Sequence, residues 1–350
     1  MARRAGVSKT TVSRVLNRRP LDIAVKDETR ARIETAAAEL GYRPSLFARG
    51  LKTKRSNLVG VIVRDLTNPF WSGMVEGISR ACGVRGYHVT LTHSLSQADE
   101  VREGVMLARL GSDGILLLGD PHNDEQALAE VVAEARAVVA VARSAGELGV
   151  PAVRVDNAGA MESVMAFLTE LGHRQIAFLG GGSDDAVERH EGFLAACARR
   201  GIPVVPEYVY SLRRHGPVSM KAGVYFARLA VRHALRLPNP PTAILATSDG
   251  LALGALSGVQ SLGLAVPRDV SVVGFDGIPF ARFVTPAMTT VEQPVRQMGE
   301  VATNLLIDII EGHVQQRPGA VIRLPARLVR RDSCGVAPTR AASASASSLA

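Results

Sequence analysis

Residues 5–17 read AGVSKTTVSRVLN and predict a short helix with one apolar and one polar face. Apolar side chains recur at the i, i+3 and i+4 positions from Val12, which is the spacing of one helix face. Ser8 is a suitable N-cap, because its hydroxyl can accept a hydrogen bond from a backbone N–H of the first turn. Gly6 can adopt the positive φ of a sharp turn between helices. This pattern predicts a helix-turn-helix, whose second helix enters the major groove of DNA.

The residues on either side of this stretch extend the pattern. A further helix is predicted over residues 27–40, because apolar residues repeat at helical spacing from Ile33 and Gly41 can end the helix. Residues 1–5 supply barely one helical turn, which is too little for a stable first helix. We therefore expect the reading frame to begin upstream of Met1.

Positive charge is concentrated in the same part of the chain. Residues 1–55 contain 14 Lys and Arg against 5 Asp and Glu, a net charge of +9, whereas the other 295 residues contain 27 against 28. A small basic segment on a neutral body is typical of nucleic-acid binding. A basic tail that serves only solubility is the alternative interpretation.

From residue 58 onward, strand-like apolar runs alternate with amphipathic helices. Strands are expected at 58–63, 87–93, 113–118, 137–142, 175–181, 204–210, 242–247 and 270–275, and a strand-like piece at 320–333. The alternation restarts near residue 160 and predicts two parallel sheets, each covered by helices on both faces. Ligands bind outside the carboxyl ends of such strands. Aromatic and charged residues follow several of these strands, which suits a sugar or a nucleobase.

The chain resembles the lactose-repressor/galactose-repressor family of bacterial transcription regulators. The resemblance rests on AGVSKTTVSRVLN (5–17), ETRARI (28–33), ELGYRP (39–44), DLTNPFW (65–71), ELGHRQIAFLGG (170–181) and VPRDVSVVGFDGIPFARFVTPAMTTVEQP (266–294). It covers about residues 1–335 and implies an α/β fold with an N-terminal helix-turn-helix headpiece and two doubly wound parallel-sheet lobes of the periplasmic-binding-protein type.

The resemblance also implies a division of the chain. The expected parts are a headpiece at 1–43, a hinge helix or linker at 44–57, a first lobe at 58–156 and 287–318, a second lobe at 157–286 and 319–338, and a disordered tail at 339–350. A flexible basic linker is the alternative for the hinge. In the family the chain crosses between the lobes three times.

The family's DNA contacts can be carried over position by position. Base-reading positions correspond to Lys9, Thr10 and Arg14, and an arginine can offer two donors to guanine. Phosphate-contacting positions correspond to Ser8, Thr11, Ser13 and Asn17. Leu51 stands where a hinge leucine wedges into a minor-groove step and kinks the duplex. A solvated helix face is the alternative for each of these residues.

The effector site is carried over in the same way. Phe70 and Trp71 are expected to stack on the effector, and Arg189 and Asp276 to bind it with charged groups. The polar residues expected to line the pocket are Asn68, Arg143, Ser248 and Gln293. Ser248 stands where many sugar-binding members have Asn, and Ala142 replaces an Asp that such members often use. The alternatives are a core role for Trp71, a turn role for Asp276 and a surface ion pair for Arg189.

These features predict a cytoplasmic transcriptional regulator, a repressor, whose partners are double-stranded operator DNA, a small effector of the sugar or nucleoside/purine class and a second copy of the chain. We expect no enzyme activity, no cofactor and no metal, because phosphate-binding and nucleophile-elbow motifs are missing and the eight histidines lack metal spacing. Three widely spaced cysteines fit a reducing compartment. No apolar run is long enough to span a membrane. A transporter's solute-binding protein is the alternative, but it does not explain the basic head.

Overall fold

The computed structural model describes residues 1–16, 25–42, 55–94, 96–119, 125–143, 149–212, 219–315 and 319–339. The chain divides into two compact units, Met1–Asn57 and Leu58–Ala350. Asn17, most of the hinge including Leu51, and the tail from residue 340 lie outside the described residues. Every helix in the described segments is too short or too polar to cross a bilayer.

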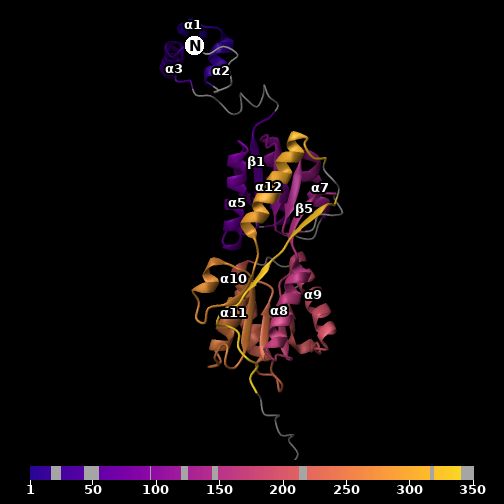
Figure 1. The fold of residues 1–350 in the computed structure, drawn as a ribbon. Coiled ribbons are helices and arrows are strands. Elements are labelled where there is room, and N and C mark those ends of the chain that lie inside the picture. The colour runs from indigo at the N-terminus through magenta and orange to yellow at the C-terminus, as the bar shows by residue number, and fades with distance from the viewer. Residues whose placement is uncertain are drawn as a thin grey trace, which may run out of the picture. The chain divides into compact units, whose positions relative to one another are not determined.

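The described residues of the first unit form three helices, α1 (Ala2–Ala5), α2 (Lys9–Leu16) and α3 (Asp27–Glu39) (Figure 1). Gly6 joins α1 to α2 with a φ of +64°, as expected of the turn. The apolar faces of the three helices form a small core of Ala5, Val12, Val15, Ile33 and Ala36. The helix-turn-helix predicted from the apolar spacing is therefore present, with a first helix of only four residues.

The first sheet of the second unit has six parallel strands in the order β11-β5-β4-β3-β1-β2. Its strands are β1 (Leu58–Val63), β2 (His88–His93), β3 (Gly114–Leu118), β4 (Val138–Val141), β5 (Ala152–Val155) and β11 (Val321–Leu324). One face packs against α5 (Phe70–Val84) and α12 (Val295–Glu311), and the other against α6 (Gln97–Arg109) and α7 (Glu125–Glu134). Alternate residues of β1 point to opposite faces, so that Val61 joins the core under α5 whereas Ile62 joins the core under α6.

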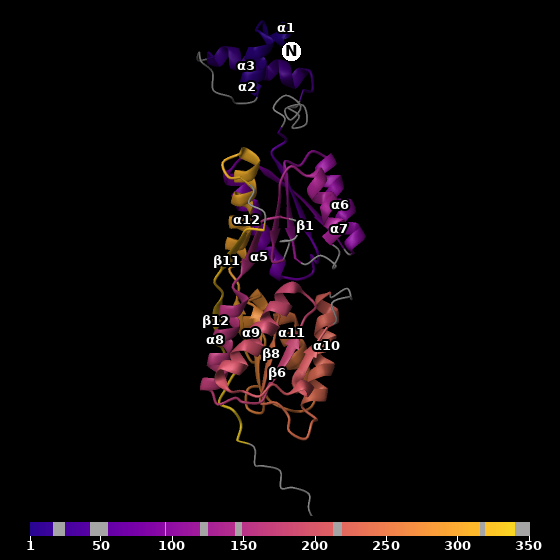
Figure 2. The same ribbon diagram turned by 90° about the vertical axis from the view of Figure 1, so that its right-hand side faces the viewer.

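The second sheet repeats this arrangement in the order β12-β10-β9-β8-β6-β7. Its strands are β6 (Ile176–Gly180), β7 (Val209–Ser211), β8 (Ala243–Ala246), β9 (Ser271–Asp276), β10 (Thr289–Glu292) and β12 (Arg327–Val329), and only β12 is antiparallel to its neighbour. One face packs against α8 (Asn157–Glu170) and α9 (Asp184–Arg200), and the other against α10 (Met220–Ala234) and α11 (Asp249–Gln260) (Figures 1 and 2). Short 3₁₀ turns lie at Pro206–Tyr208 and Pro279–Arg282. Two doubly wound lobes, as predicted from the alternation, make up this unit.

The chain passes between the two sheets three times, from β5 to α8, from β10 to α12 and from β11 to β12. Figure 2 shows β11 and β12 following one another along one side of the two lobes. The expected lobe boundaries at 287 and 319 need correction. Strand β10 belongs to the second sheet, and β11 belongs to the first. The strand-like piece at 320–333 is thus two strands in different lobes, because each completes the edge of the sheet that it reaches.

Candidate functional site

The first candidate surface is the polar face of α2. Ser8 caps the helix, since its Oγ accepts a hydrogen bond from Thr11 N at 3.0 Å and lies 2.8 Å from Thr11 Oγ1. Lys9, Thr10 and Ser13 are exposed, and Arg14 is half-buried. Because Val12 and Val15 are buried on the opposite side, hydroxyl and cationic groups occupy the side of α2 that faces away from the core. Groups of this kind are the usual partners of phosphate oxygens and base edges.

The second candidate site is a cavity of about 180 Å³ where the carboxyl ends of the two sheets meet. Seven of the eight residues expected to bind an effector line it: Asn68, Phe70, Trp71, Arg189, Ser248, Asp276 and Gln293. A smaller cavity of about 100 Å³ shares four lining residues with it, Asn68, Gly181, Ser248 and Asp276. The topology alone brings these residues together, because they follow β1, β6, β8, β9 and β10 or begin the helices after them.

The wall supplied by the first lobe is aromatic. Phe70 and Trp71 begin α5, and their rings meet edge to face with centroids 4.8 Å apart. Trp71 lies across Gly119, where an added Cβ would come within 2.9 Å of the indole. Gly119 has a φ of +82°, so both its backbone conformation and the close indole favour glycine. Trp71 is half-buried, and Gly119 packs against one side of its indole ring.

The wall supplied by the second lobe is charged, and Arg189 is its centre. The Arg189 Nε donates to Asn157 Oδ1 at 2.8 Å and the NH1 donates to the Thr247 carbonyl oxygen at 2.6 Å. The guanidinium lies 3.7 Å above the centroid of the Phe275 ring. Asp276 Oδ1 is 3.8 Å from NH1. These contacts fix the orientation of the Arg189 guanidinium. The side chain is 5% exposed and presents hydrogen-bond donors in a fixed geometry.

Asp276 ends β9 with a φ of +119°, a conformation that is costly for a residue other than glycine. Burial raises the pKa of Asp276 to about 8; the positive charge of Arg189 opposes this rise and the carboxylate of Asp249 adds to it. Burial thus favours the protonated form of this side chain, which can donate a hydrogen bond as well as accept one. Strain and a raised pKa at the same residue are typical of a binding site.

Gln293 completes the charged wall. Its Nε2 donates to Asp276 Oδ1 at 2.9 Å. Its Oε1 is buried and has no hydrogen-bond partner among the described residues. A buried acceptor of this kind needs a donor, and a hydroxyl or N–H of a bound molecule can supply it. Asn68 and Ser248 also line the cavity. Asn68 accepts a hydrogen bond from Phe70 N just before α5, and Ser248 caps α11 by accepting from Leu251 N.

The expectation that Arg143 is a pocket residue is wrong. Arg143 is completely buried inside the first lobe and pairs with Glu100 on α6, so it does not line the cavity. Its neighbour Ala142 does line the cavity, with a φ of +54°. The chain turns at Ala142, directly after β4, so that Ala142 lines the cavity whereas the Arg143 side chain lies inside the lobe beside Glu100.

Several residues that sequence reasoning did not assign also shape the cavity. Asp185, Ser183 and Thr247 line it from the second lobe, and Arg64 and Asp65 from the first. The signal for Ser183 and Asp185 is GGGSDD (180–185), a strand end followed by a helix N-terminus.

Asp249 lies behind this cavity. It is fully buried, and its carboxylate accepts from Ile278 N at 2.7 Å and Thr290 Oγ1 at 2.6 Å. Burial raises the pKa of Asp249 to about 7. By binding the backbone just after β9, this side chain fixes the segment that carries Asp276.

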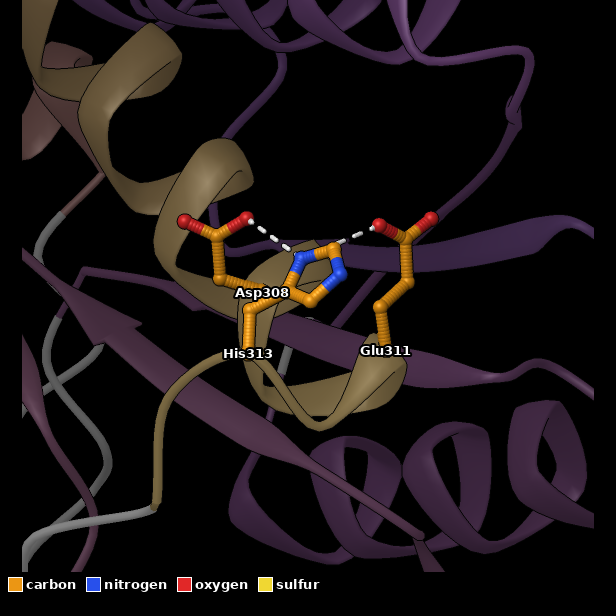
Figure 3. A group of neighbouring side chains, drawn as sticks. All are labelled: Asp308, Glu311 and His313. Carbon is orange, nitrogen blue, oxygen red and sulfur yellow. Dashed lines mark ion pairs between the residues drawn. The ribbon is translucent and has the colours of Figure 1, made fainter.

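A separate group of ionisable side chains lies at the end of α12, where the carboxylates of Asp308 and Glu311 flank the His313 ring (Figure 3). His313 Nδ1 is 3.8 Å from Asp308 Oδ1 and 3.5 Å from Glu311 Oε2. Arg85 also pairs with both carboxylates, at 2.9 and 2.6 Å. Since the Arg85 guanidinium already supplies the positive charge that a metal ion would bring, the group is an ion-pair cluster that joins α5 to α12.

Both parts of the chain match known families. Residues 1–45 match the family of bacterial regulatory proteins of the lacI type, and residues 165–334 match the periplasmic binding protein-like domain. The transcriptional repressor CytR of Escherichia coli K12 is 34% identical over 315 residues, which cover 89% of each chain. The transcriptional regulator CelR in complex with cellobiose is 32% identical, with a TM-score of 0.70 over 95% of this chain and 98% of that one. The lac repressor dimer bound to operator and the anti-inducer ONPF is 26% identical, with a TM-score of 0.80 over 95% and 97%.

Proposed function

Because the chain belongs to the lacI family of bacterial regulatory proteins, we propose that it is a transcriptional repressor that binds operator DNA as a homodimer and responds to a small effector. The observation that carries this proposal is the presence, in one chain, of a lacI-type helix-turn-helix and a cavity with one aromatic and one charged wall. A transporter's solute-binding protein needs only the cavity, so the headpiece argues against that alternative.

The proposed DNA contacts are those of the polar face of α2. Lys9, Thr10 and Arg14 read base edges, whereas Ser8, Thr11, Ser13 and Asn17 hold phosphates. Leu51 enters a minor-groove step from the hinge. Two copies of α2 in a dimer would read two half-sites about one helical turn apart.

The proposed effector is a sugar or a nucleoside. One face of such a molecule stacks on Phe70 and Trp71, and its hydroxyl or amide groups bond to Arg189, Asp276 and Gln293. The proposal is supported by the unpartnered Gln293 Oε1, which asks for a donor, and by the cellobiose that the related CelR binds. Asn68 and Ser248 contribute further polar edges, and Arg143 is left out of the site.

Effector and DNA are coupled through the lobes. A ligand held by both walls favours one angle between the lobes and thereby changes the operator affinity of the attached headpieces, and the coupling is reciprocal. The site is proposed to bind rather than to transform its ligand, so the protein is not an enzyme. As a DNA-binding regulator of a bacterial family it acts in the cytoplasm.

The test is a binding experiment with DNA selected from a random-sequence pool. We expect nanomolar-range affinity for the selected site and a steep decrease of affinity with rising salt, because cationic groups displace counterions from phosphates. Arg14→Ala should reduce discrimination between the selected site and a mutated site by about 1–3 kcal/mol. An equal loss on every sequence would remove Arg14 from base reading, and weak, salt-independent binding by the wild type would refute the proposed function.

A further inference from the structure

A partly buried network of charged side chains lies behind the effector cavity, where the first and third crossings between the lobes run side by side; Arg154 and Asp185 are buried, Glu188 is half-buried and Arg323 is exposed. Arg154 is the penultimate residue of β5 in the first lobe and is 5% exposed. Its NH2 donates to Asp185 Oδ1 at 2.5 Å and its NH1 donates to Glu188 Oε1 at 2.7 Å. Since Asp185 and Glu188 lie in the first two turns of α9, Arg154 ties a strand of one lobe to a helix of the other.

The same network reaches the cavity through Asn157, the first residue of α8. The Asn157 side chain is completely buried, and its Nδ2 donates to Asp185 Oδ1 at 3.0 Å and to Glu188 Oε2 at 2.9 Å. Its Oδ1 accepts from Arg189 Nε at 2.8 Å. Asn157 thus connects the carboxylates bound by Arg154 to the arginine at the centre of the charged wall. Arg154 itself does not line the cavity.

Glu188 brings the third crossing into the network. Arg323 on β11 is the register partner of Arg154 on β5, and two like charges on neighbouring strands repel one another. Glu188 compensates for this repulsion, because it accepts from Arg154 and also from both terminal nitrogens of Arg323 at 3.3 Å. One carboxylate on α9 therefore holds both crossing strands together.

Arg154 and Glu188 keep their charges although Arg154 is buried and Glu188 is half-buried. Burial opposes the charge of Arg154, but Asp185 and Glu188 outweigh it and the pKa of Arg154 is raised. The same balance lowers the pKa of Glu188, where burial is outweighed by Arg323, Asn157 and Arg154. Arg154 Nε is buried with no hydrogen-bond partner among the described residues. Buried ion pairs seldom add stability over apolar residues of similar size, so stability alone is a weak reason for this arrangement.

We propose that Arg154 and Glu188 are positioning residues that fix the direction of Arg189 and tie effector affinity to the angle between the lobes. A change of that angle displaces β5 and β11 relative to α9, and the rigid chain of Arg154, Asp185, Asn157 and Arg189 carries the displacement to the charged wall. This inference rests on the proposed effector site. It adds a connection between the lobe crossings and the ligand in which Arg154 does not contact the ligand.

The test compares Arg154→Met, Arg154→Lys and Glu188→Gln with Arg327→Met as a matched control. Arg327 also forms an ion pair at the third crossing, with Glu292 at 2.8 Å, but among the described residues it forms no hydrogen bond or ion pair with Arg154, Glu188 or Arg189. Binding is measured by calorimetry with cellobiose, D-ribose and cytidine as probes. For Arg154→Met we expect the Kd of whichever probe binds to rise by about 2- to 30-fold at unchanged stoichiometry, the range given by coupling energies of about 0.5–2 kcal/mol. Arg154→Lys should give a smaller rise, and Arg327→Met none.

A second measurement needs no ligand. Spin labels at Ala133→Cys on α7 and Ala195→Cys on α9, both exposed positions, report the distance between the lobes in dimers that carry one labelled chain. Burial raises the pKa of the thiols of Cys82, Cys197 and Cys334 to about 11, so they react slowly with the label at neutral pH. We expect a narrow distance distribution in the wild type and a broader one in Arg154→Met and Glu188→Gln.

The outcomes separate this inference from the proposed function. A folded Arg154→Met protein with wild-type probe affinity and a wild-type distance distribution would overturn the inference and leave the network a purely structural one. If Arg154→Met does not fold, Arg154→Lys and Glu188→Gln decide by the same two readouts. If the wild type binds no probe and no DNA, the proposed function fails. An unchanged distance distribution in the variants would then also reject the role of Arg154 and Glu188 in fixing the angle between the lobes.

Discussion

Gly77 lies on α5, whose first residues form the aromatic wall of the cavity, and faces α12 at very short range. A Cβ added to Gly77 would lie 2.1 Å from the carbonyl oxygen of Arg296 and 3.0 Å from its carbonyl carbon. Gly299 on α12 is similarly close to α5, with an added Cβ 2.4 Å from the Met74 carbonyl oxygen. Because the obstacle is backbone, no rotamer change can relieve it, and Gly77→Ala must separate the helices by about 1 Å to reach an ordinary contact distance.

The cost can be worked out from these contacts. Overpacking of this kind costs about 1–3 kcal/mol, and the upper part of the range applies because a backbone carbonyl is the neighbour. Alanine recovers up to about 1 kcal/mol of helix propensity relative to glycine. We therefore expect Gly77→Ala to lower the free energy of unfolding by about 2 kcal/mol and the Tm by about 5 °C. The shift of α5 should also weaken binding of the probe ligands.

Gly83→Ala on the same helix is the matched control. An added Cβ at Gly83 has no atom within 4 Å, so this variant should keep the wild-type Tm or gain up to about 1 kcal/mol. Urea and thermal unfolding of the two variants, followed by calorimetry with the bound probe, give the comparison. Equal stability of the two variants would refute the claim that α5 and α12 are in backbone contact at Gly77.

Three further predictions concern single side chains. Trp71→Ala should raise the Kd of the bound probe about tenfold through lost stacking and contact area, and an unchanged Kd in calorimetry would take Trp71 out of the effector site. Asp276 has a native pKa raised to about 8 by burial, against about 3.8 in the unfolded chain, so its contribution to stability is complete below pH 4 and is lost as the pH rises through 8, with a slope of up to about 1.4 kcal/mol per pH unit. Asp276→Asn should abolish this loss in urea unfolding between pH 5 and 9, and an identical slope in wild type and variant would show that Asp276 is ionised throughout. His173 is buried between Thr242 and Ser271 and its pKa is lowered by burial, so the sign is reversed: its contribution is complete above pH 6.5 and is lost as the pH falls through the lowered native pKa. The stability deficit of His173→Gln should accordingly shrink between pH 7.5 and 5.5, and a constant deficit would mean that His173 does not titrate.

Strand prediction succeeded for long apolar runs and for the alternating stretch at 87–93, which is β2, and failed for two four-residue strands that contain buried polar residues. The run LVGVIV is β1, and its burial follows from composition alone. The strands β5 (AVRV) and β10 (TTVE) were missed, because Arg154, Thr289 and Thr290 interrupt the apolar pattern. All three residues are buried nonetheless, since partners from distant segments satisfy their polar groups.

The rule that ligands bind at the carboxyl ends of strands identified which residues lie near the cavity. It did not tell in which direction their side chains point. It grouped Phe70, Trp71, Arg189 and Asp276 correctly, because parallel strands end at a common edge. For Arg143 it failed, because the same rule applies equally to a residue whose side chain turns toward Glu100 inside the lobe. One residue of offset, between Ala142 and Arg143, separates the cavity from the core.

Helical spacing, net charge and strand-helix alternation were sufficient to specify a basic helix-turn-helix headpiece followed by two parallel-sheet lobes. These properties depend on residues close together in the chain, so they can be recognised without coordinates. Folding in three dimensions assigned β10 and β11 to their lobes, raised the pKa of Asp276 and joined Arg154 to Arg189. Those outcomes depend on which residues far apart in the sequence become neighbours and on how completely water is excluded from between them. The pattern of residues along the chain shows neither.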